Sequence, residues 1–159
     1  MAATDNWDQN KEVIKVVVFQ LAEKEYMLKV DVVESIERTL SITNVPLTPS
    51  YVKGVVNLRG VITPIIDLRA RFELEMKPID EDTRNIIVSC DEFKVGLIVD
   101  AATDVIDIPK DSIEPQPKVV GSVESEFIYG VARIDKRILV MLNLNKVLIP
   151  VKRVTTDEY

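Results

Sequence analysis

Two aspartates, Asp31 and Asp100, follow matching apolar segments, and their type and spacing could supply general acid–base chemistry. A carboxylate in such a position can instead accept hydrogen bonds from the free backbone N–H groups that open a helical turn. That second role accounts for the repetition, because the same turn would be needed twice. We therefore expect each aspartate to cap one helical turn before a strand, and neither to be catalytic.

Other common catalytic and metal-binding groups are missing or isolated. The chain has no histidine, which excludes imidazole bases, histidine-dependent triads and most zinc or iron sites. The repeat counterpart of Cys90 is Leu21, so we expect Cys90 to have an apolar role in the fold. It is the only cysteine in the chain, which suits a reducing compartment. The five glycines form no phosphate-binding loop, and the acidic run 80–82 lacks the spacing of a calcium loop. The sequence predicts a protein that is not an enzyme and binds no cofactor or metal.

The charge balance narrows the class of partner. Twenty Lys and Arg against 26 Asp and Glu give a net charge of −6. A surface of this sign repels phosphate backbones, so nucleic acid is not expected as a partner. No apolar run reaches the length of a membrane-spanning helix, and the first residues lack the pattern of a signal peptide. The sequence predicts a cytoplasmic protein.

The elements that hold these residues are expected to be strands. Val and Ile contribute 24 and 17 residues against 12 Leu, and β-branched side chains favour strands. Residues 16–31 align with 85–100 at an offset of 69, and 54–68 align with 130–144 at an offset of 76. This internal duplication predicts five strands in each half. They are expected at 14–21, 25–30, 34–39, 55–59 and 61–66, and again at 85–91, 94–99, 103–108, 130–135 and 138–142.

Short helical turns are expected at matched positions. The segments from Thr48 to Gly54 and from Ser125 to Gly130 each combine a capping residue with a glycine that would end the turn. Asp67 and Asn143 precede short amphipathic runs and are expected to be N-caps. The offset between the halves rises from 69 to 76, so the second half has extra residues, which fall within 107–125. This segment contains three prolines and is expected to be a long surface loop.

Two copies of a small five-stranded barrel explain these patterns. A half of this length buries little core alone, so the halves are expected to share one. We expect a single domain over 1–159, with one subdomain at about 14–80 and the other at about 81–149. The segments 1–11 and 151–159 are expected to be mobile tails, and terminal strands could complete either barrel.

The segment KGVVNLRGVITPIIDL (53–68) closely resembles the signature of the CheW family of bacterial chemotaxis coupling proteins. Three further segments, 24–36, 95–106 and 129–148, follow that family in order and spacing, so the resemblance covers nearly the whole chain. It implies a mostly β fold of two pseudo-symmetric, intertwined five-stranded SH3-like barrels with short helical turns.

The resemblance also implies a function and two sets of site residues. Members of the family are non-enzymatic cytoplasmic scaffolds that join membrane-associated receptor arrays without inserting into the membrane. They link the cytoplasmic helical tips of chemoreceptors to the regulatory domain of the histidine kinase CheA. The matches to the receptor-binding groove are Val33, Ser35, Ile36, Arg59, Val99 and Ala102. The matches to the kinase-binding end are Ile42, Val45, Pro46, Tyr51 and Val52.

The chain departs from the family at one position of the groove. Many members have Glu where this chain has Ser35, and that Glu can pair with the arginine of the NLRG motif, which is Arg59 here. Glu34 and Glu37 flank Ser35, and we take strand alternation to place both on the opposite face. The partner of Arg59 is therefore left open.

Other interpretations compete with these roles. Val33 and Ile36 could both belong to the core; this is favoured for Ile36, whose repeat counterpart is Val105, whereas Val33, repeated as Ala102, is the better groove candidate. Arg59 could simply tie down a neighbouring carboxylate or carbonyl. A small β-barrel that binds a peptide or an oligonucleotide outside chemotaxis is the alternative from another class. The acidic balance and the 6% content of aromatic residues argue against it.

Overall fold

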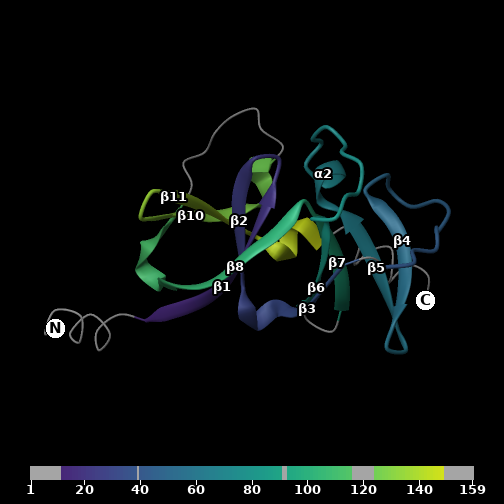
Figure 1. The fold of residues 1–159 in the computed structure, drawn as a ribbon, viewed down its shortest axis with the longest axis horizontal. Coiled ribbons are helices and arrows are strands. Elements are labelled where there is room, and N and C mark those ends of the chain that lie inside the picture. The colour runs from purple at the N-terminus through teal and green to yellow at the C-terminus, as the bar shows by residue number, and fades with distance from the viewer. Residues whose placement is uncertain (1–11, 39, 91–92, 116–123, 149–159) are drawn as a thin grey trace, which may run out of the picture.

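The computed structural model describes residues 12–38, 40–90, 93–115 and 124–148, and these form two sheets that lie side by side (Figure 1). The six-stranded sheet, here called lobe A, has the order β8-β1-β2-β11-β10-β9. Its strands are β1 (Val13–Leu21), β2 (Lys24–Lys29), β8 (Ala101–Pro109), β9 (Ile113–Glu114), β10 (Ile128–Ile134) and β11 (Arg137–Leu142). The five-stranded sheet, lobe B, has the order β3-β6-β7-β5-β4. Its strands are β3 (Val33–Glu37), β4 (Val52–Leu58), β5 (Val61–Asp67), β6 (Arg84–Cys90) and β7 (Phe93–Val99).

All ten expected strands are present, with small shifts at their ends, and the mostly β fold is confirmed. The expected loop at 107–125 is wrong in its first part, which holds the end of β8, the 3-10 turn η2 (Lys110–Ser112) and β9. Residues 116–123 of that loop and the expected tails 1–11 and 151–159 lie outside the described residues.

The two lobes exchange strands between the halves of the sequence. Lobe A combines β1 and β2 with β8 to β11, whereas lobe B combines β3 to β5 with β6 and β7. Four pairings between the described strands join the halves. Strand β1 pairs with β8 and β3 with β6 in antiparallel fashion, whereas the two parallel pairings place Tyr26 of β2 opposite Val140 of β11 and Ile66 of β5 opposite Leu97 of β7. A boundary near residue 80 therefore does not separate the sheets, and the chain crosses between lobes from β2 to β3 and from β7 to β8.

The largest buried cluster belongs to both lobes, as expected for halves that share a core. It includes Phe19 and Tyr26 of lobe A, whose rings stack with centroids 5.7 Å apart, and Ile86 and Leu97 of lobe B. Smaller clusters fill the interior of each lobe. The exchange of strands places residues from both halves in one core, so neither lobe buries its apolar face alone.

The expected caps at Asp67 and Asn143 are confirmed, and the expected cap at Asp31 is wrong. Asp67 caps α2 (Leu68–Arg71) by accepting from the Arg69 backbone N–H at 2.9 Å. Asn143 likewise accepts from Lys146 N at 3.3 Å ahead of the helix at 144–148. Asp31 caps nothing, because it lies inside the 3-10 turn η1 (Val30–Val32) and its side chain is exposed.

The segment 48–54 is not a helical turn either. It contains a single tight turn, in which Val52 N donates to Pro49 O at 3.0 Å, and Gly54 already lies within β4. In the second half, Ser125 lies inside the 3-10 turn η3 (Glu124–Phe127) instead of capping it, and Gly130 lies within β10.

Gly54 and Gly130 occupy equivalent places at which another backbone approaches closely. An added Cβ on Gly54 would lie 2.1 Å from Thr43 O, and one on Gly130 would lie 2.8 Å from Glu114 O. Thr43 pairs with Val55, just as β9 pairs with β10 through Glu114 and Val131. The glycines therefore admit an extra strand segment at the edge of each lobe.

Candidate functional site

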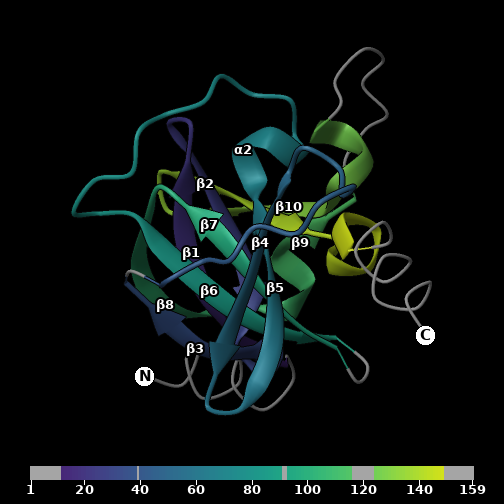
Figure 2. The ribbon, with the colours of Figure 1, turned by 90° about the vertical axis from the view of Figure 1, so that its right-hand side faces the viewer.

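The edge strands β3 and β8 carry exposed apolar side chains where the lobes meet. Ile36 on β3 is 41% exposed, although the sequence suggested that it belongs to the core, and its repeat counterpart Val105 on β8 is 57% exposed. That interpretation is wrong because alternation on an edge strand turns Ile36 outward with Glu34, as the burial pattern of β3 shows. The two residues are repeat counterparts, and β3 and β8 lie next to each other in both ribbon views (Figures 1 and 2).

The other expected groove residues differ in how much surface they offer. Val33 is half-buried and packs on the shared core, and Ala102 is half-buried at the start of β8. Val99 is 1% exposed and belongs to the shared core, so it offers no contact surface in this structure. Ser35 is half-buried, and its Oγ is buried without a hydrogen-bond partner among the described residues. We name Val33, Ile36, Ala102 and Val105 the junction surface.

Arg59 has a partner in Glu37. Arg59 lies in the turn between β4 and β5, its side chain is 77% exposed, and its Nη2 lies 3.9 Å from Glu37 Oε2. The expectation that both flanking glutamates face away from Ser35 is therefore wrong for Glu37, which lies two residues from Ser35 and shares its face. An ion pair this exposed contributes little to the stability of the fold. The Arg59 guanidinium is therefore accessible to a binding partner.

The residues matched to the kinase-binding end are divided between a loop and the core. Ile42 packs against the small core cluster of lobe B, whereas Pro46 is exposed. Leu47, which the sequence analysis missed, is fully exposed, and its signal was an apolar residue directly after a loop proline. Val45 is half-buried, and its carbonyl accepts from Thr48 Oγ1 at 3.1 Å.

Tyr51 and Val52 follow this loop in the sequence and also pack in the shared core. Val52 is 9% exposed within the shared core. The Arg71 guanidinium lies 4.8 Å from the centre of the Tyr51 ring and 4.3 Å from that of Phe127, the repeat counterpart of Tyr51. Arg71 also donates from Nε to Val147 O at 3.0 Å. Tyr51 therefore takes part in a contact that joins α2 of lobe B to lobe A.

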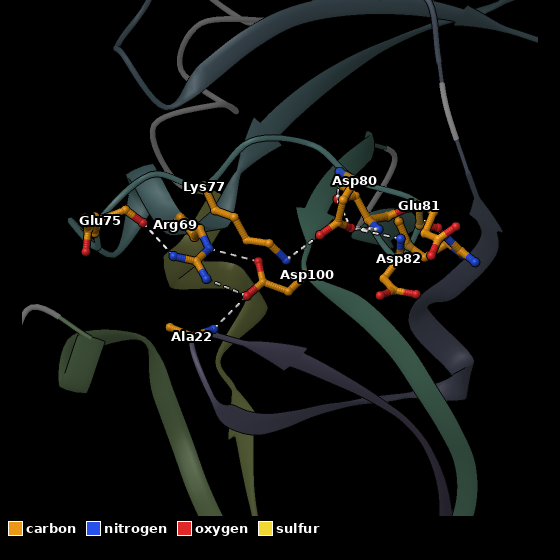
Figure 3. A network of polar contacts seen from close by, with 10 residues as sticks. Ala22, Arg69, Glu75, Lys77, Asp80, Glu81, Asp82 and Asp100 are labelled. Carbon is orange, nitrogen blue, oxygen red and sulfur yellow. Dashed lines mark hydrogen bonds and ion pairs between the residues drawn. The ribbon is translucent and has the colours of Figure 1, made fainter.

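A second polar contact between the lobes centres on Asp100 (Figure 3). Arg69 of α2 donates from Nε to Asp100 Oδ1 at 2.9 Å and from Nη2 to Oδ2 at 2.6 Å. Asp100 Oδ2 also accepts from the Ala22 backbone N–H at 2.9 Å. The expected capping role of Asp100 is therefore wrong, because its carboxylate is engaged by a helix and a hairpin turn instead of the start of a helical turn.

This contact makes stability depend on pH. The hydrogen bonds from Arg69, and then the one from Ala22, hold the pKa of Asp100 below its ordinary value against the opposing effect of burial. A carboxyl group with a lowered folded-state pKa stabilises the fold above its unfolded pKa, near 4, and loses this contribution as pH falls through the folded pKa. We expect Asp100→Asn to lower the free energy of unfolding by about 2 kcal/mol at pH 7.

Urea denaturation at a series of pH values checks this expectation. The difference in unfolding free energy between wild type and Asp100→Asn should shrink as pH falls below about 4. Asp31→Asn, at the repeat counterpart, is the control and should change stability by less than about 0.5 kcal/mol. A difference for Asp100→Asn that stays constant with pH would contradict the assignment.

The acidic and cysteine side chains of the described residues are not grouped as metal ligands. No cluster of three or more Cys, Asp or Glu side chains among them could hold a metal. A hollow of about 190 Å³ opens beside Leu28, Tyr129 and Leu144, and none of the expected partner-binding residues lines it. Among the described residues, no helix is both long and apolar enough to span a membrane.

Comparison with known proteins gives these surfaces a family context. The model of the CheW-like domain family matches residues 15–150. The chain belongs to the CheW-like family. It is 40% identical over 134 residues to the chemotaxis protein CheW of Bacillus subtilis, covering 84% of this chain and 86% of that protein. It is 33% identical to CheW of Klebsiella aerogenes, covering 83% and 80% of the two chains.

A solved structure of the CheW-like family confirms the fold. The crystal structure of the scaffolding protein TtCheW from Thermoanaerobacter tengcongensis matches with a TM-score of 0.81 and 39% sequence identity. The match covers 87% of this chain and 94% of that one. The expected fold of two SH3-like barrels and the resemblance to chemotaxis scaffolds of this family are therefore confirmed.

Proposed function

We propose that this chain is a non-enzymatic chemotaxis adaptor that couples the cytoplasmic helical tips of chemoreceptors to the histidine kinase CheA. The observation that carries the receptor part is the pair of exposed apolar residues, Ile36 and Val105, at equivalent positions on adjoining edge strands. Membership of a family whose named relatives are chemotaxis proteins supports the pathway.

The junction surface suits an amphipathic helix. A helix from a receptor tip would place its apolar stripe across Ile36 and Val105, with residues three or four apart contacting the two lobes. Arg59 would then meet polar or acidic side chains at the edge of the same contact, because its side chain is 77% exposed and its partner among the described residues is Glu37. Binding of this kind depends on complementary shape, and no catalytic residue takes part in it.

The loop that contains Ile42, Val45, Pro46 and Leu47 suits the regulatory domain of CheA. Leu47 is fully exposed, and large apolar side chains at such positions commonly anchor protein partners. Tyr51 and Val52 would support this loop from below, since both pack against the shared core. In an array of many copies, modest affinities at the two surfaces would be reinforced by avidity. The adaptor would work in the cytoplasm and reach the membrane only through receptors.

A calorimetric titration with the CheA regulatory domain from the same organism tests the kinase part. We expect binding near a 1:1 ratio, and we expect Leu47→Asp to weaken it without lowering thermal stability, because Leu47 contacts solvent. An absence of heat and of a complex on gel filtration, with both partners folded, would reject the coupling function. It would favour instead a peptide-binding barrel outside chemotaxis.

Arg59→Asp tests the receptor part. We expect it to weaken binding to a soluble receptor cytoplasmic fragment about tenfold, since arginine is enriched at anchoring positions of interfaces. CheA binding and the melting temperature should stay near wild type because the side chain is 77% exposed. Isothermal titration with both partners and circular dichroism give the three readouts. Loss of the folded signal in the variant, or unchanged receptor affinity, would remove Arg59 from the site.

A further inference from the structure

We propose that Arg69 and Asp100 are positioning residues for the junction surface, an inference that rests on the proposed function. Their ion pair fixes how the two lobes are oriented at the crossing from β7 to β8. It thereby fixes the spacing between Ile36 on lobe B and Val105 on lobe A. Neither Arg69 nor Asp100 needs to touch the receptor for this role.

Asp100 stands where the chain passes from one lobe to the other. It is the single residue between the end of β7 in lobe B and the start of β8 in lobe A. Its backbone N–H donates to Gln20 O at 3.0 Å, at the end of β1. Its carboxylate accepts from Ala22 in the β1–β2 turn of lobe A and from Arg69 on α2 of lobe B. One side chain therefore joins both lobes at the crossing.

The geometry of the contact makes it rigid. The guanidinium meets the carboxylate through two parallel hydrogen bonds, which fix orientation as well as distance. Arg69 Nη1 also donates to Glu75 O at 2.6 Å, so the arginine is held from both sides, as Figure 3 shows. The side chains of Arg69 and Asp100 are only 15% and 17% exposed, so water screens their attraction less than that of a surface pair.

The hairpin turn that Asp100 holds is itself unusual. Ala22 and Glu23 both have positive φ angles, of 51° and 70°. Two-residue turns of this kind normally use Asn-Gly because a Cβ is unfavourable there. A strained turn persists only where its surroundings impose it, and the Asp100 carboxylate bonded to Ala22 N is such a constraint. The strained turn and the ion pair together indicate that Asp100 holds this turn in a fixed position relative to α2.

At the equivalent crossing from β2 to β3, the described residues form no comparable contact. Asp31, the counterpart of Asp100, is exposed, and within the described part of the chain no ion pair reaches it. The counterpart of Arg69 is Asn145, whose Oδ1 accepts from Cys90 Sγ at 2.9 Å. Of the two crossings, the one from β7 to β8 therefore has an ion pair between the lobes, and the described residues at the other form none. This asymmetry also supplies a control, since Asp31→Asn removes the same charge from a matched place.

Distances between the lobes can be measured without any partner. Spin labels at Ile62→Cys on lobe B and Ile138→Cys on lobe A, both at exposed positions, report the lobe orientation in a Cys90→Ala background. We expect a narrow distance distribution in the parent protein and in Asp31→Asn. We expect a broadened or shifted distribution in Asp100→Asn and in Arg69→Lys, which keeps the charge but loses the paired hydrogen bonds. A narrow, unshifted distribution in both test variants would overturn the proposal.

Titration with a soluble receptor cytoplasmic fragment links orientation to binding. We expect Asp100→Asn and Arg69→Lys to lower receptor affinity about tenfold, and to leave affinity for the CheA regulatory domain within about twofold of wild type. Unchanged receptor affinity despite a broadened distribution would overturn the positioning role. An equal loss in Asp31→Asn with an unchanged distribution would do the same, because charge alone would then explain the loss.

Two further outcomes are separable. If Asp100→Asn does not fold, Arg69→Lys alone decides between the two results above. If the wild-type protein binds no receptor fragment, the proposed function fails, while the label distances still show whether the ion pair orients the lobes.

Discussion

Gly54→Ala is expected to lower the free energy of unfolding by about 3–5 kcal/mol, enough to unfold a domain of ordinary stability. The new Cβ would lie 2.1 Å from Thr43 O and 2.8 Å from Ile42 Cγ2, and the obstacle includes backbone that cannot rotate away. The φ angle of +144° is also one that residues with a Cβ rarely adopt. Strand β4 and the segment at Thr43 would have to separate, which breaks both hydrogen bonds between Thr43 and Val55.

Two other glycines make this prediction specific. At Gly130 the added Cβ meets Glu114 O at 2.8 Å without a positive φ, so Gly130→Ala should cost less, about 1–3 kcal/mol. At Gly60, with φ of +84°, nothing lies within 4 Å, so only backbone strain remains, about 1 kcal/mol. Urea denaturation followed by circular dichroism gives the three values. Equal losses at all three positions would contradict the close approach as the cause.

The strands were predictable because their signals are local. The abundance of β-branched residues and the internal duplication placed all ten strands of the two halves, and the caps Asp67 and Asn143 followed from the residue before each short helix. The exchange of strands was not predictable in the same way. Pairing of β2 with β11 and of β7 with β5 depends on which apolar faces meet in the shared core, and no short window of sequence contains that information.

Predictions for individual residues were wrong where contacts or a position in the sheet, set by distant parts of the chain, determine the role. Asp100 has the local features of a cap, yet its carboxylate is engaged by Arg69, 31 residues earlier in the chain. Ile36 and Val105 are apolar residues of the kind found in cores, and they are exposed because they lie on edge strands. Glu37 was within reach of sequence reasoning, because a period of two places it on the same face as Ser35.

Ile36→Glu and Val105→Glu are each expected to weaken binding of a receptor cytoplasmic fragment by about 2–3 kcal/mol, or roughly 30- to 150-fold. An apolar helix stripe laid across the junction surface would have to desolvate the new carboxylate without offering it a partner. Each side chain is at least 41% exposed in the free protein, so the fold itself should lose little stability. Calorimetric titration with the receptor fragment measures the effect.

The repeat relation between these two residues makes the test stricter. If one helix contacts both lobes at once, each substitution alone should remove most of the affinity, and the double variant should lose less than the sum, because the helix is already released. Ile79→Glu, which adds the same charge at a 69% exposed isoleucine outside the junction surface, should leave receptor binding near wild type. Equal losses in Ile79→Glu would reduce the effect to net charge. Full binding by Val105→Glu beside lost binding by Ile36→Glu would confine the receptor to lobe B and leave the junction between the lobes without a part in recognition.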